Sequence, residues 1–244
     1  NVAAEHLTEK YTAIAAGATS VEMETGYWLL VDVTDVDGET DAMNSALLQV
    51  TGNIEIAKKY NTPTVVKKVD DENDSVADKE DTEAVEGEDG KDWQDSADHD
   101  IGDAVPFLLT ATLANNVSDY DTYKIVFHDT LSAGLTYNKD AVVKFGETNV
   151  TDKFTITEEG GKLTISCDDV KAFGATDSSI ITVEYTATLN KNAVIGADGN
   201  PNTVNLEYSN NPNWVPSGNP DEKEPTGETP DDTVIVFTYK VVST

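Results

Sequence analysis

The chain has 244 residues, and its 46 acidic residues against 16 basic ones give a formal net charge of −30 at pH 7. A field of this sign repels nucleic acid and anionic membranes, so neither is an expected partner. The single cysteine, Cys167, excludes an internal disulfide and is expected to be a buried free thiol, because no cationic group near it in the sequence favours a thiolate.

Short runs of β-branched and aromatic residues follow one another along the chain, separated by Gly, Asn, Asp and Pro. This pattern is typical of an all-β, Ig-like sandwich. The expected strands span 26–33, 46–50, 54–57, 64–69, 104–113, 123–129, 142–145, 154–157, 162–167, 180–189, 203–208 and 233–239. Helix is expected only at 6–16 and, for about one turn, at 168–173.

A domain boundary is predicted at Pro63, where a new strand begins. Residues 1–62 have too few strands to close a sandwich and are interpreted as the C-terminal remainder of a preceding domain, whereas 63–244 form a complete one. The sequence shows no signal peptide, transmembrane run or anchor signal, so we expect a piece of a longer protein.

Two polar loops are expected on this domain. Residues 70–92 are very acidic, and although Asp70, Asp71, Glu72 and Asp74 offer oxygen ligands for Ca²⁺, they lack the glycine and final glutamate of an EF-hand loop. A solvated loop without a cofactor is therefore preferred over a calcium site. Residues 210–230 form the second loop, in which Trp214 is expected to cap the sandwich edge or to face a neighbouring subunit.

Three polar side chains are predicted to point into the core, because residues two apart on a strand share a face. Lys67 alternates with Val65 and Val69, Asp103 with Val105 and Phe107, and Asn202 with Val204, Leu206 and Tyr208. If these strands meet, an amine, a carboxyl and a carboxamide lie together in a dry interior.

Such a triad can form a Lys–Asn isopeptide bond. Burial lowers the pKa of Lys67 and yields a nucleophilic amine, and a neutral Asp103 polarises the Asn202 carbonyl while ammonia leaves. The alternatives are a buried Lys–Asp ion pair with Asn as a hydrogen-bond partner, and a lysine at a sheet edge that reaches water. A register shift of one residue would exchange Lys67 for Lys68.

Five motifs, taken in order, resemble the isopeptide-forming central domain of backbone pilins from sortase-assembled pili of Gram-positive bacteria. They read PTVVKKV, WQDSADHDIGDAVPF, FHDTLSAGLTY, VEYTATLNKNAVIG and GNPNTVNLEYSNNPN, between Pro63 and about Lys240. The resemblance implies a collagen-adhesin-like Ig fold with Lys67 bonded to Asn202 and Asp103 as the catalyst. It also implies a secreted, cell-wall-anchored structural subunit that crosslinks itself once and is no conventional enzyme.

The first segment is similar to the end of a pilin N-terminal domain, through GYWLLV, SALLQVTG and IEIAKKYN. In such pilins sortase joins a lysine near this strand to the next subunit, and the resemblance implies Lys59 or, as second choice, Lys58 for that role. The Tyr-Pro-Lys motif of the family is missing here, so an ordinary surface lysine is an equal alternative. An adhesin that binds a host or microbial ligand through loops 70–92 and 210–230 is the alternative function. His6, His99 and His128 show no metal-ligand spacing and are interpreted as structural or exposed.

Overall fold

The computed structural model describes residues 20–31, 45–51, 62–71, 85–86, 91–214 and 223–239. In this part of the chain the regular secondary structure is nearly all strand, with three short 3-10 helices, η2 (Val117–Asp119), η3 (Thr151–Lys153) and η4 (Val170–Phe173). The predicted all-β sandwich is confirmed. No helix within these ranges is long and apolar enough to cross a membrane.

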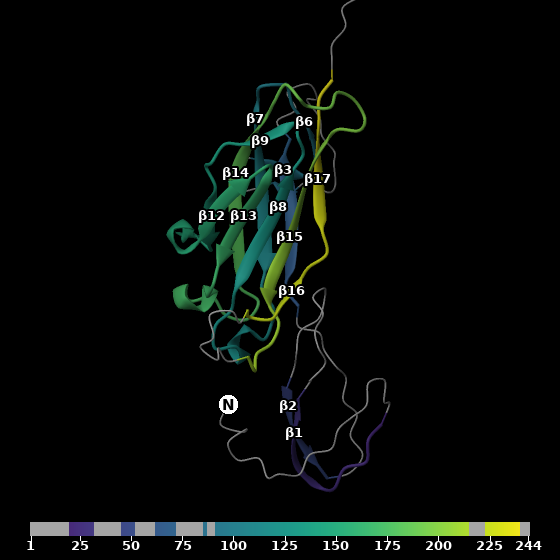
Figure 1. The fold of residues 1–244 in the computed structure, drawn as a ribbon, viewed down its shortest axis with the longest axis vertical. Helices are drawn as coiled ribbons and strands as arrows, with labels where there is room; N and C mark the ends of the chain where they lie inside the picture. The colour runs from purple at the N-terminus through teal and green to yellow at the C-terminus, as the bar shows by residue number, and fades with distance from the viewer. Residues whose placement is uncertain are drawn as a thin grey trace, which may run out of the picture.

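Two large sheets face each other (Figure 1). The first runs in the order β11 (Thr148–Asn149), β10 (Val142–Phe145), β14 (Ile180–Leu189), β7 (Ala104–Thr112), β3 (Thr64–Asp70), β5 (Asp92–Gln94) and β4 (Val85–Glu86), with β9 (Leu135–Tyr137) beside β14. The second runs β12 (Thr155–Glu159), β13 (Lys162–Cys167), β8 (Ile125–Leu131), β15 (Asn200–Ser209), β17 (Asp232–Phe237) and β6 (Ser96–Asp98), with β16 (Thr226–Glu228) beside β15. A separate two-stranded sheet, β1 (Gly26–Val31) with β2 (Ser45–Val50), lies beyond one end of the sandwich (Figure 1).

The core lies between the two large sheets and follows the alternation of each strand. On β7 the side chains of Val105, Phe107, Leu109 and Ala111 are fully buried, and the residues between them are half-buried. Burial of this apolar face on both sheets is the main source of stability in such a sandwich. Any polar residue that shares the inner face is therefore placed in the same dry layer.

The expected strands agree with the structure at β10, β13 and β14 to the residue. Strands β4, β5, β6, β9, β11 and β16 were not expected, because each has two or three residues and forms only through pairing with a neighbour. Strand β8 continues to Leu131, two residues past the expected end. The short helix near 168–173 is present as η4, whose N-cap Asp169 accepts a hydrogen bond from the Lys171 amide.

Several predictions concern residues outside the described ranges, among them the helix at 6–16 and the strand at 54–57. The domain boundary stays a prediction. Pro63 is buried and directly precedes β3.

Candidate crosslinking site

Strand β3 carries Lys67 into the core. Its side chain is fully buried between the inward-facing Val65 and Val69, whereas Lys68 points outward and pairs with Asp95 at 2.6 Å. The register is held from both sides: β3 pairs with β7 so that Lys67 lies opposite Leu109, and the Lys67 amide donates to Asp232 Oδ2 at 2.6 Å. Of the two neighbouring lysines, the structure therefore places Lys67 inside, as the alternation predicts.

The Lys67 amine meets two oxygen atoms in the core. Nζ lies 2.6 Å from Asp129 Oδ2 and 3.0 Å from the Tyr185 hydroxyl oxygen, and that hydroxyl donates to the same Asp129 oxygen at 2.8 Å. Asp129 comes from β8 of the second sheet, and Tyr185 comes from β14 of the first. The amine, the carboxyl and the phenol thus form a closed triangle across the interface of the two sheets.

Asn202 completes the cluster from β15. Its Nδ2 donates to the Tyr185 oxygen at 2.7 Å, and its Oδ1 is buried with no hydrogen-bond partner among the described residues. Asn200, two residues earlier, is also buried, but both its Oδ1 and its Nδ2 are bound to backbone groups. Of these two asparagines on β15, Asn202 is therefore the one whose carbonyl is left available.

Electrostatics at this cluster favour the neutral amine. Burial, the largest influence, lowers the pKa of Lys67, and Asp129 and the nearby Asp232 offset only part of that effect. The aromatic rings of Phe107 and Tyr185, whose centroids lie 5.2 and 5.3 Å from Nζ, exclude water and stack on each other. Burial and the neighbouring Asp129 raise the pKa of Tyr185 well above its ordinary value, so its hydroxyl keeps its proton.

The expectation for Asp103 is wrong. Asp103 is exposed just before β7, where its Oδ2 accepts a hydrogen bond from the Asp100 amide in a turn. Asp103 alternates with the inward-facing residues of β7 but lies too far along the chain to reach Lys67. Leu109 lies opposite Lys67, and the six residues between positions 103 and 109 correspond to roughly 20 Å along a strand. Asp103 caps a turn at one end of the sandwich, and Asp129 takes its expected place beside Lys67.

The sequence did contain a signal for Asp129. Ile125, Phe127 and Leu131 alternate with it, and all four side chains are buried. The strand was expected to end at 129, so Leu131 was not included in the apolar alternation that identifies Asp129 as a core-facing residue. Tyr185 gave no comparable signal, since a buried tyrosine between Val183 and Ala187 is an ordinary core residue.

The remaining predicted features are the intersubunit lysines, the acidic loop and the single cysteine. Lys58, Lys59, Glu72 and Asp74 fall outside the described residues. Asp70 Oδ1 accepts from the Asp92 amide at 2.8 Å, and no cluster of metal-ligating side chains occurs in the described ranges. Cys167 is a buried free cysteine, and burial raises the pKa of its thiol.

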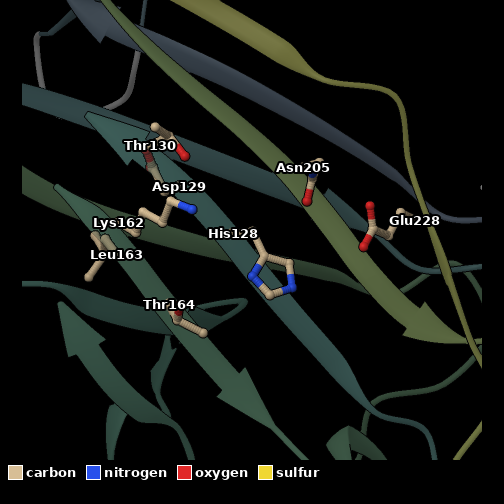
Figure 2. Close-up of a pocket in the computed structure, with 8 residues that line it drawn as sticks. All are labelled: His128, Asp129, Thr130, Lys162, Leu163, Thr164, Asn205 and Glu228. Carbon is tan, nitrogen blue, oxygen red and sulfur yellow. The ribbon is translucent and has the colours of Figure 1, made fainter. Parts of the chain in front are cut away.

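The outer face of the second sheet has a shallow hollow next to the same stretch of β8 (Figure 2). It is lined by polar side chains from three adjacent strands and from β16, among them His128, Thr164, Asn205 and Glu228. His128 Nε2 lies 2.9 Å from Glu207 Oε2, and the hydrogen bonds from His128 and Lys124 lower the pKa of Glu207 to about 2. The contrast between the polar outer face and the buried Asp129 follows from the alternation of β8.

Comparisons with known proteins agree with this architecture. Residues 101–212, just under half of the chain, match the family model "Gram-positive pilin backbone subunit 2, Cna-B-like domain". The trypsin-resistant surface T6 protein of Streptococcus pyogenes serotype M6 is 27% identical over 154 residues, which cover 58% of this chain and 29% of that protein.

Solved structures of major pilins share the fold. The T6 backbone pilin of serotype M6 Streptococcus pyogenes aligns with a TM-score of 0.56 and 21% identity over 88% of this chain and 47% of that one. The 35 kDa C-terminal fragment of the major pilin of Streptococcus agalactiae gives a TM-score of 0.50 and 21% identity over 72% and 56% of the two chains. The major pilin subunit of Bacillus cereus gives a TM-score of 0.51 and 16% identity over 80% and 49%.

This chain spans about half or less of the length of these relatives. The matched region includes Asp129, Tyr185 and Asn202, and the sandwich that carries them has the fold of the solved pilins. Residues 101–212 of this chain therefore resemble the Cna-B-like domain of Gram-positive pilin backbone subunits.

Proposed function

We propose that this chain is part of a structural subunit of a covalently assembled cell-surface pilus, and that an intramolecular isopeptide bond between Lys67 and Asn202 ties its sandwich together. The observation that supports the proposal is the cluster of four buried groups. Lys67 Nζ, Asp129, Tyr185 and Asn202 lie in one dry layer and are connected by hydrogen bonds of 2.6 to 3.0 Å.

The bond forms in one turnover. A proton moves from Lys67 Nζ to Asp129, which gives a neutral amine and a neutral acid at unchanged total charge. The Nζ lone pair attacks Asn202 Cγ, and the carbonyl electron pair moves to Oδ1. When the carbonyl re-forms, the Cγ–Nδ2 bond breaks, Nζ loses a proton, Nδ2 gains one, and ammonia leaves.

The acid acts on the carbonyl oxygen. Asp129 Oδ1 and Asn202 Oδ1 are both buried and have no partner among the described residues. A protonated Asp129 offers the hydrogen-bond donor that the Asn202 oxygen lacks, and this donor stabilises the oxyanion as it forms. Folding brings the groups together at high effective concentration, so no external enzyme is required for this step.

Assembly into a pilus is the second part of the proposal. The relatives are backbone or major pilins, so the partners proposed for this chain are neighbouring pilin subunits, joined by sortase through Lys59 or Lys58. The product is an extracellular pilus anchored to the cell wall. Incubation with a pilus sortase and a sorting-signal peptide tests this part: the proposal predicts coupling that Lys59→Ala or Lys58→Ala removes, and coupling at other lysines contradicts it.

The intact mass of the folded protein tests the internal bond. The proposal predicts a mass that is lower than the sequence mass by one ammonia, with the sequence mass restored in Lys67→Ala and Asn202→Ala. Lys68→Ala and Asn200→Ala are the matched controls, because they alter the neighbouring lysine and the neighbouring buried asparagine. A folded wild-type protein at its full sequence mass would show that no such bond forms.

A further inference from the structure

The Tyr185 hydroxyl touches both nitrogen atoms that change partners in the proposed reaction. Its oxygen lies 3.0 Å from Lys67 Nζ, the attacking nitrogen, and 2.7 Å from Asn202 Nδ2, the nitrogen that leaves as ammonia. Its own proton is donated to Asp129 Oδ2 at 2.8 Å. Among the described side chains, this phenol is the group whose hydrogen bonds reach nucleophile, leaving group and acid together.

The proposed reaction has a proton-transfer problem that the acid alone does not solve. The attacking nitrogen must lose a proton and the leaving nitrogen must gain one, because an amide anion is a very poor leaving group. Asp129 Oδ2 contacts Nζ but has no hydrogen bond to Nδ2, which donates to the Tyr185 oxygen. In a site with no exposure to solvent, water is not at hand to carry the proton between them.

We propose that Tyr185 is a further catalytic residue of the crosslinking reaction, acting as the proton relay between Asp129 and the departing Asn202 amide nitrogen. This inference rests on the proposed isopeptide bond. The relay starts from the neutral amine and the neutral Asp129 acid: after the attack Nζ passes its second proton to Asp129 Oδ2, the Tyr185 hydroxyl delivers its proton to Nδ2, and the phenol regains a proton from Asp129 Oδ2. The Cγ–Nδ2 bond breaks as Nδ2 is protonated, and Asp129 and Tyr185 end the cycle unchanged.

The phenol is held in place for this role by its ring. Phe107 stacks on Tyr185 with ring centroids 5.3 Å apart, and Tyr137 packs against it edge-on at 5.7 Å. Strand β14 pairs with β7 so that Tyr185 lies opposite Phe107, which fixes the height of the hydroxyl in the core. The ring contacts do not depend on the hydroxyl, so removal of the oxygen alone separates its chemical role from its packing role.

The test follows the loss of ammonia over time by intact mass after rapid cell-free synthesis of wild type, Tyr185→Phe and the control Tyr137→Phe. Tyr137 also packs in this aromatic group, but its hydroxyl accepts from the Ala141 amide and contacts none of the reacting atoms. We expect Tyr185→Phe to fold, as judged by near-UV circular dichroism, and to lose ammonia roughly 100-fold more slowly than wild type, the lower end of general acid–base effects. Tyr137→Phe is expected to react at the wild-type rate.

The outcomes separate the two proposals. If wild type and Tyr185→Phe lose ammonia at the same rate, the relay is overturned and the bond itself stands. If wild type never loses ammonia, the bond is overturned and the relay with it. Should Tyr185→Phe fail to fold, site-specific 3-fluorotyrosine at 185 keeps the ring and acidifies the phenol; a changed rate supports the relay, and an unchanged rate overturns it.

Discussion

Lys67 is unusual because it is a lysine whose side chain is fully buried in the core of the sandwich. An isolated ammonium in a protein core is costly, and partnering with Asp129 recovers that cost only when the geometry is good. Conversion to an amide removes the charge from the core altogether. The proposed reaction at Lys67 would therefore also remove an electrostatic penalty of the folded state.

Asp129 is expected to be required for the bond, whereas Asp103 is not. In Asp129→Asn the side chain keeps its shape but cannot take the proton from Nζ, so ammonia loss should slow by at least on the order of 100-fold. Asp103→Asn, the matched change at the exposed turn, should leave crosslinking complete. Intact mass of both folded variants checks this; a blocked reaction in Asp103→Asn with a normal one in Asp129→Asn would reverse the assignment.

The lowered pKa of Lys67 predicts a pH effect on protein that cannot crosslink. In Asn202→Ala the unfolded chain keeps Lys67 protonated up to a pH near the ordinary value of 10.5, while the folded state releases that proton earlier. Between the two pKa values the unfolded state binds the additional proton, so the free energy of unfolding should increase as pH rises. Below the folded-state pKa, Lys67 adds no pH dependence.

Urea unfolding of Asn202→Ala at several pH values checks this effect. The series should stop below about pH 10, where ionisation of tyrosines in the unfolded chain begins to act in the opposite direction. Lys67→Met combined with Asn202→Ala is the control, because it removes the titrating group. An equal pH dependence in both proteins would show that Lys67 is not the source.

At the scale of the strand, alternation predicted most of the site and failed where height along the strand mattered. Lys67 and Asn202 were found because apolar neighbours two residues away identify the inner face. Parity says nothing about which residues of facing strands lie at the same level, and Asp103 was assigned from parity and from the resemblance, without any information on that level. That level depends on the register of strand pairing, which the sequence of one strand alone does not specify. In the structure Lys67 pairs with Leu109 and Asn202 pairs with Leu131.

The same limit explains which strands were missed. The long strands have four or more residues with a clear apolar face, so the sequence identifies them. The short ones, such as β6 and β9, are ordered by their partners β17 and β14. Tyr185 was missed for a related reason, since its hydroxyl gains a role only through atoms on β3, β8 and β15.

The turn between β8 and β9 positions the start of β15 and predicts an element-level effect. A Cβ on Gly134 would lie 2.1 Å from Asn200 Oδ1 and 2.8 Å from Ala193 Cα, so Gly134→Ala forces this turn away from β15. We expect a loss of about 1–3 kcal/mol in the free energy of unfolding, as for other overpacked sites. Thermal unfolding checks this against Ala133→Ser, an exposed neighbour expected to change little; equal midpoints would contradict the packing argument.

At the scale of the molecule, the proposed bond joins the two sheets. Lys67 belongs to the first large sheet and Asn202 to the second. The sandwich begins with β3 at the end near β1 and β2, and β17 runs to the opposite end (Figure 1). Tension between these ends would pass from β3 into β15 through the bond, so the chain between Lys67 and Asn202 would be shielded from it.

The bond should also raise thermal stability. It closes a loop of roughly 135 residues, which restricts the unfolded chain by about 5 kcal/mol in the loop-entropy treatment. For a domain of this size, that corresponds to a midpoint roughly 10–20 °C higher than in protein without the bond. Calorimetry on wild type and Lys67→Met provides the comparison.

Lys67→Met combined with Asp129→Leu separates the bond from a simple ion pair. Replacing both partners of a buried ion pair by apolar residues is often neutral or stabilising, so with only an ion pair in wild type, the midpoint of this double variant would be equal or higher. With the covalent bond, it should fall. Asn202→Ala, which cannot crosslink but keeps the lysine, should fall as well.

Peptide mapping of the purified, folded protein tests the Lys67–Asn202 bond most directly. After proteolysis, tandem mass spectrometry should find a branched peptide in which the segment containing Lys67 is joined to the segment containing Asn202, one ammonia lighter than the two together. Cleavage by trypsin after residue 67 should be absent, because its side chain is acylated. Recovery of the two segments as separate, unmodified peptides, or of Lys67 joined to a different residue, would contradict the account.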